Sequence, residues 1–127
     1  MFGRTRILLA ITACVLAIPA TAQTPAPTTA FDGRYIGVSH ESSKVGSTPG
    51  AKCRPNGVPA PLTIRNGMIR QPGSEGWQGA VSPQGGVTMR NANSQRVDGQ
   101  IDPQGTITAK YSGPACITTF VWHKQSG

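Results

Sequence analysis

A tandem pair of near-identical segments constrains this chain more than any other feature. Residues 79–90 read GAVSPQGGVTMR, and residues 99–110 read GQIDPQGTITAK. In both, apolar residues alternate with others on each side of a Pro-Gln-Gly turn. Proline presets φ for the second turn position, and glycine supplies the left-handed residue that closes a hairpin. Each segment is therefore predicted to be a strand, a turn and a strand.

Three further segments add to this pattern. An Asn66-Gly67 turn between residues 62–65 and 68–70 is the strongest short-range hairpin signal, and it predicts that Ile64 lies opposite Ile69. Residues 31–40 and 115–124 are also β-prone, and apolar side chains on both faces of the last segment favour a strand that closes the sheet. Residues 41–61 are rich in Gly, Pro and Ser without alternation, so they predict an unusually long loop.

These segments predict an all-β fold, an antiparallel meander of about eight short strands without helical periodicity. A meander has to hide its edges and one apolar face, so we expect a small barrel, with a two-sheet sandwich as the alternative. Three glycines inside strands, Gly37, Gly79 and Gly99, are expected at close bends of such a sheet.

The first 22 residues are predicted to be an export signal. Arg4 and Arg6 precede an apolar run over residues 7–18 that is too short to span a bilayer, and residues 20–22 read Ala-Thr-Ala, a signal-peptidase pattern. Residues 23–30 are then predicted to form a disordered Pro/Thr linker, and residues 31–127 are predicted to form a single β domain. The expected location is the periplasm or the extracellular space, with a lipid anchor at Cys14 as the alternative.

Two cysteines, Cys53 and Cys116, remain after removal of such a signal. In an exported protein an even pair predicts one disulfide. The bond would close a loop over a separation of 63 residues, which by loop entropy stabilises the fold by about 4 kcal/mol. A reactive thiol pair is disfavoured because the chain has no CxxC spacing.

Several of these motifs together resemble a known group of proteins. The opening F-D-G-x-Y-x-G at residues 31–37, the L-T-I-x-N-G hairpin at residues 62–67, the repeats and the cysteine of the last strand resemble small uncharacterised exported β proteins of Gram-negative bacteria. The resemblance covers the mature domain. It implies export and a β fold, and it brings no activity.

No catalytic, cofactor-binding or metal site is predicted, and we expect that the protein is not an enzyme. His40 and His123 could be neighbours if the first and last strands pair, but two histidines without a third ligand do not make a zinc site. Both are interpreted as surface residues on edge positions. Asp32 and Asp102 lie in predicted turns, where their side chains cap backbone N–H groups. No two carboxylates have a spacing that suggests acid–base chemistry.

The basic residues carry the one non-random pattern. The net charge is +7, or +5 without Arg4 and Arg6. The hairpins place five cations on outward positions, which are the candidate anion-binding residues: Arg65, Arg70, Arg90, Arg96 and Lys110. Such a strip could bind envelope polysaccharide or lipid head groups, although outward cations also keep β proteins soluble and protect sheet edges. Nucleic acid is the least expected partner, because the aromatic residues are predicted to face inward and leave no stacking platform.

The sequence thus predicts a non-catalytic exported β-barrel module that binds an anionic envelope component. One alternative is a periplasmic inhibitor or protective protein, of which lysozyme inhibitors are an example. The positive charge of the mature chain would oppose its encounter with such basic targets. The other alternative is a small-ligand carrier, since meander barrels can hold apolar molecules. An interior filled by Trp77, Phe120 and Trp122 would speak against a carrier.

Overall fold

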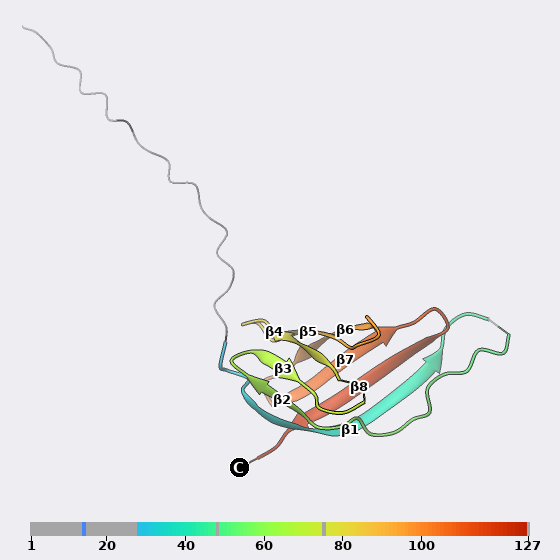
Figure 1. Cartoon of the computed structure of the whole chain (residues 1–127), viewed down its shortest axis with the longest axis horizontal. Helices are drawn as coiled ribbons and strands as arrows, with labels where there is room; N and C mark the ends of the chain where they lie inside the picture. Colours follow the sequence, from blue (N-terminus) through green and yellow to red (C-terminus); the bar gives the residue numbers. More distant parts are fainter. Residues whose placement is uncertain (1–13, 15–27, 48, 75, 127) are drawn as a thin grey trace, which may run out of the picture.

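Eight antiparallel strands form a closed barrel in chain order, with the last strand paired to the first (Figure 1). The computed structural model describes Cys14 and residues 28–47, 49–74 and 76–126. The strands are β1 (Gly33–Lys44), β2 (Leu62–Arg65), β3 (Met68–Arg70), β4 (Gln78–Val81), β5 (Gly86–Arg90), β6 (Arg96–Ile101), β7 (Thr106–Ser112) and β8 (Cys116–Lys124). The predicted all-β meander barrel is therefore confirmed, and the sandwich alternative is wrong.

The predicted export signal and most of the linker lie outside the described residues, since only Cys14 and residues 28–30 of residues 1–30 are described. Cys14 is a free, exposed cysteine. Within the described ranges there is no helix of the length and hydropathy that crossing a bilayer requires.

The Asn66-Gly67 hairpin has the predicted register. Arg65 pairs with Met68 and Ile64 with Ile69. Both turn residues have positive φ, 52° for Asn66 and 74° for Gly67, as a two-residue turn between twisted strands requires. Burial alternates along both strands, so that one face packs into the barrel and the other faces solvent.

The two repeats fold identically at their turns. Gly85 and Gly105 have φ of 86° and 84°, and each donates its N–H to the carbonyl of the first turn residue, Ser82 or Asp102. The side chains of these two residues accept a further bond, at 2.9 Å from the N–H of Gly86 and of Thr106 respectively. Residues 79–90 thus form the β4–β5 hairpin and residues 99–110 the β6–β7 hairpin, as predicted.

The barrel interior is filled by large side chains. Phe120 stacks on Trp122 with ring centroids 5.7 Å apart, and Trp77 meets Phe120 edge-on at 5.8 Å. All three side chains are at most 2% exposed. The buried core comprises Tyr35, Leu62, Ile64, Ile69, Trp77, Val81, Val87, Met89, Val97, Ile101, Ile107, Ala109, Phe120 and Trp122. This filled interior is the observation that speaks against a carrier of apolar molecules.

The predicted loop over residues 41–61 is wrong at its start. Residues 41–44 continue β1 and pair with β8, from Glu41 opposite Thr119 to Lys44 opposite Cys116. These residues are Glu, Ser, Ser and Lys, so no apolar alternation marked them as a strand; the length of β8 extends the pairing instead. The rest of the segment, residues 45–61, is called the strap below.

The strap is held to the barrel at several points. Cys53 and Cys116 form the predicted disulfide, with Cα atoms 5.7 Å apart. Farther along, Gly57 and His40 exchange two backbone hydrogen bonds of 2.7 and 3.0 Å. Because β1 pairs with β2 only over residues 33–35, the strap covers the part of the β1 edge that β2 leaves open. The long connection is therefore part of the barrel wall.

Candidate functional site

The sheet register aligns one row of side chains across six strands on the outer face of the barrel. Successive register pairs join Arg34 to Thr63, Thr63 to Arg70, Arg70 to Gln78, Gln78 to Arg90, and Arg90 to Arg96. All six residues are exposed. We call this set the arginine row. Neighbouring strands lie about 4.8 Å apart, so residues two strands apart in the row are separated by about 10 Å at the backbone.

A second row lies beside the first on the same face. Its register pairs run from β2 to β7 through Arg65, Met68, Ala80, Thr88, Asp98 and Lys110. Arg65 and Lys110 thus occupy opposite ends of this row, with Asp98 next to Lys110. The prediction that all five candidate cations face outward is confirmed, because each is exposed.

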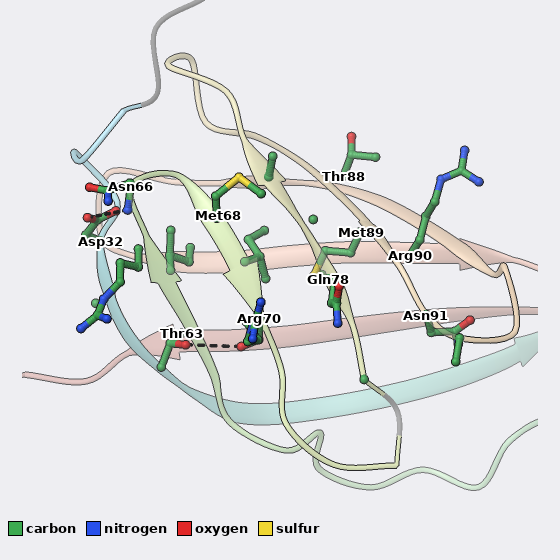
Figure 2. A pocket seen from close by; sticks show the side chains of 18 residues that line it. Asp32, Thr63, Asn66, Met68, Arg70, Gln78, Thr88, Met89, Arg90 and Asn91 are labelled. Atoms are coloured by element: carbon green, nitrogen blue, oxygen red, sulfur yellow. Dashed lines mark hydrogen bonds between the residues drawn. The ribbon is translucent and has the colours of Figure 1, made fainter.

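The outer surface of β2 to β5 is hollowed. A hollow of about 1570 Å³ is lined by three of the predicted cations, Arg65, Arg70 and Arg90, together with polar, small and apolar residues. Figure 2 shows Thr63, Arg70, Gln78 and Asn91 along one side, and Met68 and Thr88 on the other. We call it the outer hollow. Its only described acid is Asp32, whose carboxylate accepts the N–H groups of Asn66 and Gly67 at 2.8 and 3.2 Å.

The predicted cations differ in their partners. Arg96 forms an ion pair with Asp98 at 3.0 Å, and its Nε also donates to that carboxylate. Lys110 lies opposite the same Asp98, and neither Arg96 nor Lys110 lines the outer hollow. By contrast, Arg65, Arg70 and Arg90 make no ion pair with any described residue. The structure therefore divides the predicted strip into three cations in the hollow and two beside an acid.

Arg34 is a further cation of the row that sequence reasoning missed. It is exposed, lies opposite Thr63 and borders the outer hollow, whose lining includes the preceding Gly33. The sequence held a signal for the outward position of Arg34, because the next residue is the aromatic Tyr35, which is buried. Alternation along β1 places Arg34 on the outer face.

The two histidines do not form a site together. His40 lies opposite Phe120 and is 8% exposed, whereas His123 is exposed on the outer face, opposite Ile36, and contacts the Thr106 hydroxyl at 3.0 Å. The prediction that both are surface residues is wrong for His40, because the strap covers it at Gly57. No group of three or more possible metal ligands occurs among the described residues.

His40 is electrostatically unusual. Its Nδ1 is buried and finds no hydrogen-bond partner in the described part of the chain. Burial, and after it the positive charge of Arg54, lower the pKa of His40 from its ordinary value. The ring is therefore neutral at physiological pH and packs 5.9 Å from Phe120. This arrangement belongs to the interior and does not face the outer hollow.

A smaller recess of about 290 Å³ lies at the end of the barrel that carries the disulfide. Its lining includes Lys52 and Arg54 of the strap above Trp77 and Phe120, and the Arg54 guanidinium carbon lies 5.6 Å from the centre of the Phe120 ring. The recess therefore lies against two side chains of the buried core.

Comparison with models of known protein families, with curated proteins and with solved structures finds no match for this chain. The resemblance to exported β proteins of Gram-negative bacteria stays a prediction, as does the alternative of a periplasmic inhibitor.

Proposed function

We propose that this protein is a non-catalytic exported β-barrel module that binds an anionic component of the cell envelope in the outer hollow. One observation carries the proposal. Arg65, Arg70 and Arg90 line the hollow without an ion-pair partner among the described residues. The arginine side chain presents a planar fork of N–H donors that suits carboxylate, sulfate and phosphate groups.

The polar residues of the hollow suit binding. Thr63 and Gln78 offer hydroxyl and amide groups that can bond to a hydroxylated ligand. The carboxylate of Asp32, the one acid among the described lining residues, already accepts the N–H groups of a turn. The bonded Cys53–Cys116 pair fits an oxidising compartment, which supports export.

The cations of the hollow are tested by binding of polygalacturonate, an acidic polysaccharide. We expect the double variant Arg70→Gln and Arg90→Gln to bind polygalacturonate about tenfold more weakly than the wild type, because each exposed ion pair contributes up to ~1 kcal/mol. Wild-type binding is expected to weaken strongly as ionic strength rises from about 0.05 to about 0.5 M, since screening shortens the reach of exposed charges. Titration calorimetry measures both effects.

The single variant Arg90→Gln has a matched control that loses the same one charge outside the hollow. Lys110 lies on the same sheet face, opposite Asp98. The variant Lys110→Gln is expected to change the affinity for polygalacturonate less than about twofold. Equal weakening by Lys110→Gln and Arg90→Gln would mean that net charge, and not the hollow, governs binding. Absence of polygalacturonate binding by the wild type at low salt would reject the proposal.

The export part of the proposal predicts the mass of the mature chain. Expressed with its own first 22 residues in a Gram-negative host, the protein should be recovered from the periplasm with Gln23 as its first residue. Its intact mass should lie two hydrogen masses below that of the dithiol form. Recovery of the uncut chain from the cytoplasm would contradict export, and a lipid-modified N-terminus at Cys14 would show the membrane-anchored alternative.

A further inference from the structure

The arginine row alternates between cations and neutral hydrogen-bonding residues. From β1 to β5 its members are Arg34, Thr63, Arg70, Gln78 and Arg90, so that a charge stands on every second strand. The four from β2 to β5 line the outer hollow. Neither neutral residue is apolar, although the outer face offers Met68 and Ala80 in the row beside it. The row is thus a repeating array of charge and hydrogen-bonding capacity.

The repeat has a fixed length. Adjacent strands lie about 4.8 Å apart, so one cation follows the next after about 10 Å at the backbone. An extended chain of pyranose sugars advances by a similar distance per sugar as the sheet does per strand. A glycan lying across the strands can therefore place one sugar over each position of the row.

Resting on the proposed function, the geometry points to the ligand class: we propose that the outer hollow binds an extended glycan in which an anionic sugar alternates with a neutral sugar. The acidic groups meet Arg34, Arg70 and Arg90, and the hydroxyls of the intervening sugars bond to Thr63 and Gln78. Guanidinium forks bind carboxylate or sulfate through two parallel hydrogen bonds. Threonine hydroxyls and glutamine amides both donate and accept, as sugar hydroxyls do.

The surroundings of the row fit a sugar chain. Gln78 makes no side-chain hydrogen bond with another described residue, and the Thr63 hydroxyl makes a long one of 3.4 Å to the Arg70 carbonyl. Met68 is 62% exposed in the hollow, where its thioether can pack against the C–H face of a ring. No described residue of the hollow is aromatic, so recognition rests on charge and hydrogen bonds.

The row also has a defined end. On β6 the next member is Arg96, which is already bonded to Asp98. The carboxylate of Asp98 would repel a further acidic group there. The usable array therefore ends at Arg90, and a short oligosaccharide is long enough to occupy it.

The test compares two hexasaccharides of equal length on the mature protein by titration calorimetry. A hyaluronan hexasaccharide carries a carboxylate on every second sugar, and hexagalacturonate carries one on every sugar. The hyaluronan fragment is expected to bind at least as tightly, although it has half the charge. Gln78→Leu is expected to weaken its binding about fivefold, as the loss of one hydrogen bond predicts, and to leave hexagalacturonate binding less affected.

Gln100→Leu is the matched control, because Gln100 is exposed on the outer face of β6 and does not line the outer hollow. It should leave both affinities unchanged, and circular dichroism confirms that each variant folds. Tenfold tighter binding of hexagalacturonate, with no effect of Gln78→Leu, would overturn the alternating-glycan inference and leave the proposed function standing. Failure of both oligosaccharides and of polygalacturonate to bind would overturn the two together.

Discussion

Replacing Gly79 with valine is expected to destabilise the barrel by about 3 kcal/mol or more. Gly79 lies on the inward-facing side of β4, in register with Met89. A Cβ atom there would overlap the carbonyl oxygen of Thr88 and lie 2.8 Å from the Cα atom of Met89. Both obstacles are backbone atoms of β5, so they can move only by breaking the ladder between the two strands. Overpacking that forces backbone shifts costs about 1–3 kcal/mol and at times more. Urea unfolding followed by fluorescence of the buried tryptophans measures the change.

The second repeat provides an independent replicate. A Cβ at Gly99 would overlap the carbonyl oxygen of Thr108 and lie 2.6 Å from the Cα atom of Ala109. Gly99→Val should therefore cost about as much as Gly79→Val. The control is Ala80→Val, which adds bulk on the exposed side of β4 and is expected to stay within about 0.5 kcal/mol of the wild type. A loss at Ala80 as large as at Gly79 would show that β4 tolerates no change, and the steric explanation would fail.

The close approach of neighbouring strands at Gly79 and Gly99 could be predicted from the sequence pattern. The repeat begins with glycine where an alternating strand should place an inward side chain, and the only spatial reason for that choice is a close approach of the neighbouring strand. The Pro-Gln-Gly and Asn-Gly turns each specify a register between adjacent strands. Combined with alternation, these registers place Arg65, Arg70 and Arg90 on the outer face, so turn chemistry and alternation are sufficient to identify the outward cations.

The position of the strap and the alignment of Arg34 could not be predicted from the sequence. A long connection has no turn rule, so nothing in residues 45–61 specifies the register of β1 against β2. The alignment of Arg34 with Thr63 depends on that register. The same gap hid the burial of His40, because the strap residue that covers it, Gly57, pairs with it through backbone atoms alone. Ion pairing of Arg96 with Asp98 likewise depends on side-chain geometry that alternation does not fix.

Replacing both disulfide cysteines, Cys53→Ser with Cys116→Ser, is expected to lower the free energy of unfolding by about 4 kcal/mol. The bond joins residues 63 positions apart, and loop closure over that length removes much entropy from the unfolded chain. For a domain of about 100 residues the same loss lowers the melting temperature by about 20 °C. Calorimetric scans of the oxidised wild type, the reduced wild type and the double variant measure it, and the last two should agree.

The location of the bond predicts which part of the molecule responds. Without it, the middle of the strap is held by the backbone pair of Gly57 with His40 and by a 3.1 Å bond from the Ser42 N–H to the Asn56 side chain. The ends of the strap keep their own bonds, from the Val45 N–H to the Ala115 carbonyl and from the Gln71 and Trp122 side chains to the Ala60 carbonyl. The contacts of the middle of the strap are with β1, so amide exchange should accelerate first between the two anchored ends of the strap and in the last third of β1. No described residue of the strap lines the outer hollow, so polygalacturonate affinity below the melting transition should be unchanged. A double variant that loses less than about 1 kcal/mol would mean that the unfolded chain is already compact enough for the bond to constrain little. Loss of polygalacturonate binding by the folded variant would instead show that the strap affects the arginines of the hollow and that the ligand lies near the disulfide end of the barrel.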